Sequence, residues 1–195
     1  MKKSECLIVV AHPDELNDNF KSLGDQLLVT GVGKINAAYH LTKKLTEMRL
    51  AGKSPKYVIN MGSSGSKHFK KGALVYCNQF IQHDMDVSAF TKNQKCQTPG
   101  DTEVILEHKN LLSDLPKAIC GTGDCFVTTQ TIDSRVQVVE MEAYALARVC
   151  KQESIDFIAI KYITDGLDEN GGDDWKHEVK SSADIMYDYL NKLWN

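Results

Sequence analysis

The sequence predicts an α/β protein that folds as a single domain over residues 1–195. Short runs rich in β-branched residues alternate with segments of helical period, a pattern typical of an α/β sheet and not of a β-sandwich or a helical bundle. The length of 195 residues suits one α/β domain with a sizeable hydrophobic core. The sequence contains no internal repeat and no segment long enough to be a domain linker.

Seven strands are expected where apolar and β-branched residues are dense. These segments are 6–11, 26–30, 57–61, 73–81, 118–121, 136–139 and 156–164. Helices are expected after residues 30–34, after residues 139–142 and at the end of the chain. The last helix is the clearest, because its apolar residues recur at spacings of three or four and form one stripe that would pack on the sheet. The polar, glycine-rich segment 168–174 is expected to be the loop that precedes it.

Composition and charge favour a small-molecule partner. The chain has 42% apolar and 25% charged residues and a formal net charge of -3, which gives it no electrostatic reason to bind nucleic acid or an anionic membrane. Its N-terminal apolar run is short for a secretory signal, and no stretch approaches the roughly 20 apolar residues of a membrane-spanning helix. We therefore expect a cytoplasmic protein whose six cysteines are reduced thiols.

No metal site is expected from the spacing of possible ligands. Cys120 and Cys125 lie close together in the sequence but lack a second pair of ligands. His68, His83 and Asp84 lack the spacing of a metal-binding motif, and solvated loops explain them better.

Two glycine-containing segments follow predicted strands. In VTGVGKINAA (29–38) the backbone amides could bind an anion, but the spacing is neither that of a Walker loop nor GxGxxG, so a tight turn with close packing at Ala37 and Ala38 is the simpler interpretation. In VINMGSSGSKH (58–68), Ser63, Ser64 and Gly65 offer amides and hydroxyls at a strand end. Ligands of open α/β sheets bind at the carboxyl ends of strands, so both segments should share one rim.

Three carboxylates are expected at the same rim. Glu15, Glu142 and Asp165 each follow a different predicted strand. Taken singly, each is explained by helix capping or solvation, but their shared location is typical of a site. Acids without a metal cluster or nucleotide loop suit cleavage of a glycosidic bond, where one acid protonates the leaving group and another carboxylate orients water.

Seven motifs occur in order along the chain: AHPDEL, TGVGKINAA, VINMGSSGS, HDMDVSAF, GTGDCFV, VVEMEAYALARVC and YITDGLDE. In this order they resemble the 5′-methylthioadenosine/S-adenosylhomocysteine nucleosidases of the nucleoside phosphorylase and nucleosidase superfamily. The resemblance covers nearly the whole chain and implies a three-layer α/β/α fold around a central mixed, twisted β-sheet. It also implies a homodimeric hydrolase that acts on a small nucleoside and water without a cofactor.

The resemblance assigns roles to individual residues. Asp165 resembles the general acid that protonates purine N7, a role that requires a raised pKa at neutral pH. Glu142 resembles the acid that binds the ribose hydroxyls, with Met141 packed against the sugar. Glu15 resembles the acid that orients the attacking water, helped by Ser63. Glu140, two residues before Glu142, is expected only to support that arrangement.

The remaining expected substrate contacts also follow from the resemblance. Phe126 would stack on adenine and Val127 would bind it through backbone groups. Ser64, Gly65 and Thr164 belong to the same motifs and are expected to contact the substrate. Phe90 resembles a residue that the dimer partner contributes to the pocket for the 5′ substituent.

Two alternatives remain open from the residues. A phosphorylase would hold phosphate, usually with arginine forks, but the chain has only Arg49, Arg135 and Arg148, and none lies in the glycine-containing segments; hydrolysis is therefore favoured. A non-catalytic nucleoside-binding protein of the same fold is the second alternative. An aspartic acid facing N7 can also accept a hydrogen bond from a 6-amino group, which favours adenine over a 6-oxopurine.

The chain departs from the family pattern at several points. Lys161 stands where these nucleosidases usually have an arginine, and the change would alter how the water-orienting acid is held, because a lysine is a point charge and not a planar fork. His12 replaces a methionine, either as a polar contact to ribose or, as we favour, as a surface substitution. The segments before residue 27 and before residue 118 are shorter than usual, which leaves the 5′ substituent open.

Overall fold

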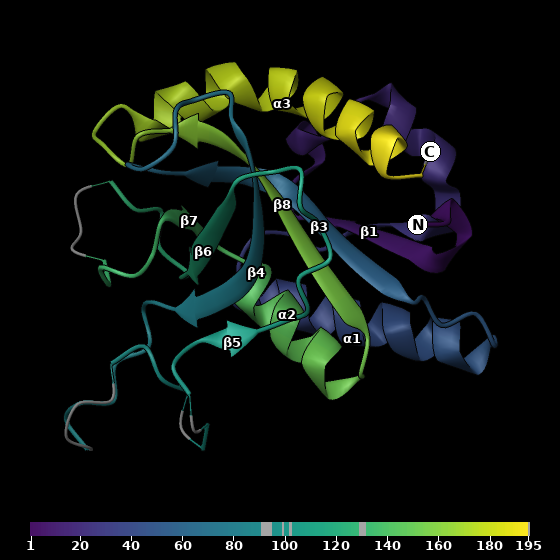
Figure 1. Cartoon of the computed structure of the whole chain (residues 1–195), viewed down its shortest axis with the longest axis horizontal. Helices are drawn as coiled ribbons and strands as arrows, with labels where there is room; N and C mark the ends of the chain where they lie inside the picture. The colour runs from purple at the N-terminus through teal and green to yellow at the C-terminus, as the bar shows by residue number, and fades with distance from the viewer. Residues whose placement is uncertain (91–94, 99, 102, 129–131, 195) are drawn as a thin grey trace.

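The computed structural model describes the 195-residue chain except residues 91–94, 99, 102, 129–131 and 195. It contains an eight-stranded mixed, twisted sheet with helices on both faces, a three-layer α/β/α arrangement as expected (Figure 1). The strands are β1 (Cys6–Val10), β2 (Leu27–Val29), β3 (Tyr57–Gly65), β4 (Leu74–Gln82), β5 (Leu106–Glu107), β6 (Lys117–Thr122), β7 (Val138–Glu140) and β8 (Asp156–Asp165). The helices are α1 (Lys34–Leu50), α2 (Ala143–Gln152) and α3 (Gly171–Trp194), with short 3-10 segments at Lys3–Glu5, Pro13–Glu15 and Asp18–Gln26.

Five strands of the sheet pair in a closed circuit. β3 pairs with β7, β7 with β6, β6 with β4, β4 with β8, and β8 again with β3. β8 runs parallel to β3 and antiparallel to β4, so the sheet is mixed. The contact between β3 and β7 is the single pair Gly65 and Val139. This pair brings the carboxyl end of β3 beside the end of β7, so the circuit closes where the predicted site residues lie.

The helices bury apolar stripes on opposite faces of the sheet (Figure 1). α1 and α2 pack on one face through Leu41, Leu45 and Leu146. α3 packs on the other face together with the 3-10 segment Asp18–Gln26, and its Met186 and Leu190 are fully buried there. Each fully buried aliphatic side chain contributes about 1.5–3 kcal/mol relative to an exposed one. The regularly spaced apolar residues of the last helix therefore pack in the hydrophobic core.

The end of one strand, the start of one helix and one additional strand differ from the expected elements. β3 continues through Ser63, Ser64 and Gly65, because their backbone groups pair with β8. α3 begins at Gly171, so residues 171–174 form its first turn, and its aspartates are favourably placed at the positive end of the helix dipole. The expectation of a loop there was wrong. β5 was not predicted because two residues carry no readable alternation.

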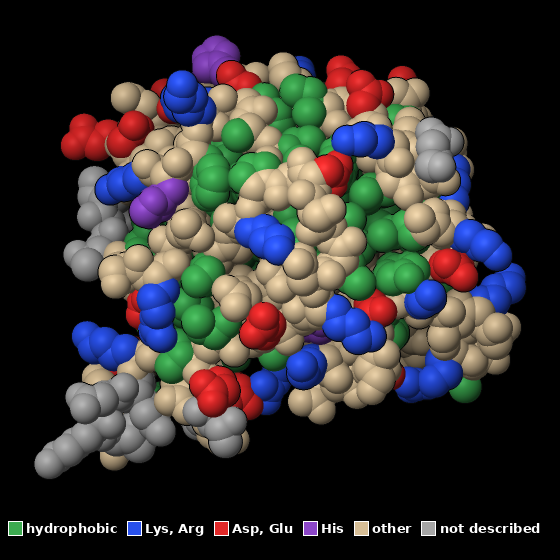
Figure 2. Space-filling model, viewed as in Figure 1, with side chains coloured by type: hydrophobic (Ala, Val, Ile, Leu, Met, Phe, Trp, Pro, Cys, Tyr) green, Lys and Arg blue, Asp and Glu red, His purple; other side chains and the backbone are tan. Residues whose placement is uncertain are grey.

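The surface carries charges of both signs. Figure 2 shows lysine, arginine and acidic side chains interspersed over the face seen in Figure 1. Within the described part of the chain, no helix has the length and apolar character required to cross a membrane. Five of the six cysteines are buried, and Cys125 is the exposed one.

Candidate active site

A cavity of about 210 Å³ lies where β3, β7 and β8 end. Four carboxylates on its wall, Glu15, Glu140, Glu142 and Asp165, are only 3–6% exposed. Ten of the eleven predicted site residues line it: Glu15, Ser63, Ser64, Gly65, Phe126, Val127, Met141, Glu142, Thr164 and Asp165. Segments far apart in the sequence therefore meet at one rim, as the strand-end argument predicts.

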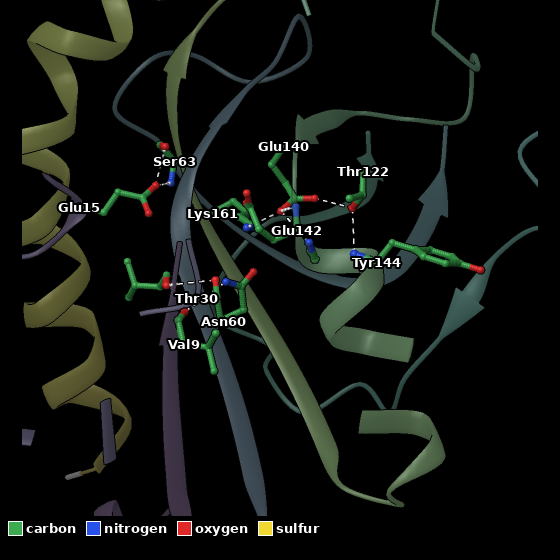
Figure 3. A network of polar contacts seen from close by, with 12 residues as sticks. Val9, Glu15, Thr30, Asn60, Ser63, Thr122, Glu140, Glu142, Tyr144 and Lys161 are labelled. Atoms are coloured by element: carbon green, nitrogen blue, oxygen red, sulfur yellow. Dashed lines mark hydrogen bonds and ion pairs between the residues drawn. The ribbon is translucent and has the colours of Figure 1, made fainter. Parts of the chain in front are cut away.

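Glu15 is held at one end of the cavity by Ser63. The Ser63 amide and hydroxyl donate to the same oxygen, Glu15 Oε1, at 2.7 and 2.6 Å (Figure 3). The second oxygen, Oε2, accepts the backbone N–H of His12 at 3.2 Å, which closes a capping box on the short helix Pro13–Glu15. The protein itself thus donates three hydrogen bonds to the Glu15 carboxylate.

Asp165 is the last residue of β8, and a bulge sets its direction. Ser64 pairs with Ile163 and Gly65 with Asp165, so one residue of β8, Thr164, is left out of register. The Asp165 carboxylate accepts hydrogen bonds from the Thr164 hydroxyl at 2.9 Å and from the Leu167 amide at 3.0 Å. Burial raises the pKa of Asp165 against these two hydrogen bonds.

Gly65 makes room for this acid. A Cβ at Gly65 would overlap Asp165 Oδ1 and the Leu167 side chain. The glycine is therefore required by the close approach of β3 to Asp165 and not by its backbone angles. Sequence reasoning expected Gly65 to contact substrate, and the structure adds this spatial reason for it.

Glu142 lies between β7 and α2 and reaches the first glycine-containing segment. Its Oε1 accepts the amide of Gly33 at 2.8 Å, and Gly33 has a φ of +94° that favours glycine. The amide of Lys34 is likewise bound to Asp124 at 2.8 Å. The protein's own carboxylates thus take the amides that an anion would need, and Ala37 packs in the core, as the tight-turn interpretation expects.

The protonation of Glu142 is shifted by its surroundings. Burial, followed by the negative charge of Glu140, raises the pKa of Glu142 to about 8. A carboxyl that is largely protonated at neutral pH can both donate to and accept from hydroxyl groups. That property suits a group that binds a diol.

Glu140 lies beside Glu142 and accepts hydrogen bonds from several neighbouring groups (Figure 3). It accepts the Glu142 and Ala143 amides at 2.9 and 2.8 Å, the Thr122 hydroxyl, and Lys161 Nζ at 3.0 Å. Burial acts to raise the pKa of Glu140, but Lys161 and these donors bring it below its ordinary value. Burial likewise opposes the charge on Lys161, which Glu140 outweighs, so the Lys161 pKa is raised. Glu140 thus supports Glu142, as expected.

Lys161 does not hold Glu15, contrary to our expectation. Its side chain is 1% exposed and its ion-pair partner is Glu140. A lysine has one cationic nitrogen to place, and here it is placed on the neighbour of Glu142. The departure from arginine therefore bears on the Glu140 network and not on the carboxylate near His12.

The remaining wall is partly apolar. Phe126 and Val127 lie on one wall of the cavity, and Phe126 is half-exposed while Val127 is buried. Met141 lies between the two glutamates in sequence and lines the cavity. Among the described residues the hydroxyl of Ser64 is buried without a hydrogen-bond partner.

Phe90 does not line the cavity of its own chain. Its side chain is 90% exposed. Its assignment to a partner's pocket stays a prediction.

Sequence reasoning missed several cavity residues. Trp175, in the second turn of α3, donates its indole N–H to Ser63 Oγ at 2.8 Å. His12, which we favoured as a surface substitution, also lines the cavity, with its ring edge-on to Trp175 and 5.8 Å between the ring centroids. The predicted apolar stripe of the last helix began at Val179 and therefore did not include Trp175. The position of this tryptophan directly after the glycine-rich segment could have indicated its role.

The three arginines lie away from the cavity, each paired with a carboxylate. Arg49 pairs with Glu153, Arg135 with Asp133 at 2.7 Å, and Arg148 with Asp101 at 2.6 Å. Among the residues described, the cavity wall includes neither arginine nor lysine. The wall that this chain presents therefore lacks the fork that would grip a phosphate.

Comparison with known proteins agrees with the fold. The sequence model of the phosphorylase superfamily matches residues 26–190. The chain belongs to this superfamily. Within it, the chain is 34% identical to a 5′-methylthioadenosine/S-adenosylhomocysteine nucleosidase of Haemophilus influenzae over 86% of this chain and 81% of the relative. It is 32% identical to the nucleosidase of the same name from Bacillus velezensis over 80% and 74%. The resemblance to these nucleosidases is confirmed.

Solved structures show the superfamily fold at lower identity. A Helicobacter pylori 5′-methylthioadenosine/S-adenosylhomocysteine nucleosidase with butyl-thio-DADMe-Immucillin-A superposes with a TM-score of 0.80, at 21% identity over 96% of both chains. Futalosine hydrolase of the same species gives 0.80, at 21% identity over 95% of both chains. Because two differently named hydrolases match equally well, this superfamily fold does not select the substrate.

Proposed function

We propose that the protein is a purine nucleosidase that hydrolyses the N-glycosidic bond of 5′-substituted adenosines, such as methylthioadenosine and S-adenosylhomocysteine, and releases adenine. One observation carries the proposal: Glu15, Glu142 and Asp165 are buried on three separate segments yet line one cavity. The relatives named above support the substrate class. We also propose that residues 1–195 act as one nucleosidase-like domain.

Asp165 acts as the general acid in this proposal. As the bond to the sugar breaks, the base gains electron density, and a proton delivered to N7 stabilises the leaving group. Burial favours the protonated form of Asp165, which the step requires. A carboxyl beside N7 can also accept from a 6-amino group, so the same residue selects adenine.

Glu15 and Ser63 guide the attacking water. The sugar develops oxocarbenium character as the base departs, and water then attacks the anomeric carbon. Glu15 has one oxygen fixed by Ser63 and the other by a backbone amide, so its remaining lone pairs face a defined direction. A carboxylate held in this way orients water without reorganising during the reaction.

Glu142 and Met141 bind the sugar, and the aromatic wall binds the base. A protonated Glu142 can donate to one ribose hydroxyl and accept from the other. Phe126 stacks on adenine, Val127 reads its edge through backbone groups, and Ser64, Gly65 and Thr164 close the floor beside Asp165.

The proposed assembly is a homodimer in the cytoplasm. Ile35 and Tyr39, four residues apart on α1, are 82% and 61% exposed, and Phe90 is also exposed. Large exposed apolar side chains on one helix face are typical of an interface. In the dimer, Phe90 would complete the partner's pocket for the 5′ substituent. Five buried cysteines that form no disulfide, Cys6, Cys77, Cys96, Cys120 and Cys150, suit a reducing compartment.

A substrate panel in phosphate-free buffer tests the proposal. Methylthioadenosine, S-adenosylhomocysteine, adenosine, futalosine and inosine are each incubated with the protein, and the free base is measured by chromatography. Release of adenine from the first two, with little base from inosine, is expected. Release that requires added phosphate would select the phosphorylase alternative. Tight binding without base release would select the non-catalytic alternative.

A further inference from the structure

Trp175 is linked to Glu15 through one hydroxyl group. The indole N–H of Trp175 donates to Ser63 Oγ at 2.8 Å, and Ser63 Oγ donates to Glu15 Oε1 at 2.6 Å. All three residues line the cavity. The link joins α3, β3 and the 3-10 segment Pro13–Glu15, which are distant in the sequence. Through Trp175, the N-terminal part of α3 therefore contacts Ser63, the residue that holds the Glu15 carboxylate.

The indole of Trp175 determines which groups donate and which accept in these two hydrogen bonds. An indole nitrogen can only donate, whereas a hydroxyl donates one hydrogen and accepts through its lone pairs. Because Trp175 occupies an acceptor position on Ser63 Oγ, the single hydroxyl hydrogen is left to point at Glu15. A phenyl ring at the same place would fill the space but would leave the hydroxyl free to rotate.

The ring itself is held in place. The His12 ring packs edge-on against it, with 5.8 Å between centroids and an interplanar angle of 77°. His12 also gives its backbone N–H to Glu15 Oε2 at 3.2 Å. His12 and Ser63, which both contact the indole, are thus the same two residues that hold the two oxygens of Glu15.

We propose that Trp175 is a positioning residue for the water-orienting carboxylate, acting through the Ser63 hydroxyl. The inference rests on the proposed hydrolytic function and deepens it. Trp175 fixes the hydroxyl as a donor to Glu15, and Glu15 then presents its free lone pairs to the attacking water in one orientation. The effect of Trp175 belongs to the chemical step and not to the affinity for the nucleoside.

The variant Trp175→Phe separates this role from packing. It removes one donor and keeps an aromatic ring on the cavity wall. We expect kcat for adenine release from methylthioadenosine to fall roughly fivefold, the size of one hydrogen bond, while KM changes less than about twofold, since only the chemical step loses an interaction. The matched control is Trp194→Phe, which alters the other tryptophan, near the end of α3 and outside the cavity. Its kcat should equal that of the unaltered chain.

A double-mutant cycle with Ser63→Ala tests whether Trp175 acts through that hydroxyl. Once the hydroxyl is gone the indole has nothing to orient, so Trp175→Phe should cost nothing further in kcat in the Ser63→Ala background. Thermal unfolding of each variant is measured in parallel, and its midpoint should not follow the loss of kcat.

Several results would overturn the inference. An unchanged kcat for Trp175→Phe, a rise in KM alone, or a further fivefold loss in the Ser63→Ala background would each show that Trp175 does not act through Ser63. These results leave the proposed function intact as long as the unaltered chain releases adenine. If the unaltered chain releases no adenine, the proposed function itself is wrong and the inference falls with it.

Discussion

Gly65 and Asp165 are partners in the parallel pairing of β3 with β8, and the bulge at Thr164 lies directly before the acid. The pairing leaves no space for a side chain at Gly65, because a Cβ would overlap Asp165 Oδ1 and Leu167. The direction of Asp165 therefore depends on a residue that contributes no functional group.

Gly65→Ala should reduce turnover with a modest loss of stability. The new methyl group displaces Asp165, and overpacking of this kind costs about 1–3 kcal/mol of unfolding free energy, while a displaced general acid loses more than tenfold in kcat. The control is Gly172→Ala on α3, where a Cβ would meet no atom within 4 Å. Adenine release and urea unfolding are measured for both variants. Full activity in Gly65→Ala would show that the position of Asp165 is not constrained in this way.

Asp165→Asn should nearly abolish base release while the fold is retained. An amide cannot deliver the proton, and general acid catalysis contributes about 10²–10⁴-fold. Because burial raises the pKa of Asp165, kcat/KM of the unaltered chain should fall as pH rises through that pKa and the acid ionises. The measurement is a pH profile of adenine release. A variant with the rate of the unaltered chain would remove Asp165 from the mechanism.

Glu142→Gln should flatten the dependence of stability on pH. The folded-state pKa of Glu142, about 8, lies above its ordinary value of 4.5. The stability linked to this group is therefore fully present below about pH 4.5 and is lost as pH rises through about 8. Glutamine cannot ionise, so the variant should gain stability relative to the unaltered chain between these pH values. Urea unfolding at several pH values measures the difference, and a constant difference would contradict the raised pKa.

Lys161→Met should destabilise the protein by about 3–5 kcal/mol, because it leaves Glu140 buried without its cation. The double variant with Glu140→Gln should recover much of this loss. Lys21→Met is the control, since the Lys21 and Asp18 pair is exposed and should have no measurable effect. Equal stability of the single and double variants by urea unfolding would show that the ion pair does not hold the wall.

Much of the fold was predictable because its signals are local. β-branched runs identified the major strands, and the apolar spacing from Val179 onward identified α3. The pairing of Gly65 with Val139 was not predictable, because β7 has three residues and the contact joins segments 74 positions apart. The first turn of α3 was missed because its two glycines resemble a loop.

The sequence predicted which residues belong to the site better than it predicted the contacts between them. The motifs located ten of the cavity residues, since each lies near or shortly after the end of a strand. They did not show that Lys161 pairs with Glu140. Whether its side chain reaches Glu140 or Glu15 depends on side-chain direction in three dimensions. Nor did they reveal Trp175, whose importance rests on a hydrogen bond to a residue 112 positions away.

Incorporation of the oxygen isotope from labelled water into the sugar product distinguishes hydrolysis by this protein from phosphorolysis. Methylthioadenosine is incubated with the protein in labelled water that also contains phosphate, and the sugar product is analysed by mass spectrometry. We expect free adenine and a free sugar that carries one labelled oxygen at the anomeric position. A sugar 1-phosphate without the label, or no cleavage of the nucleoside, would contradict this expectation.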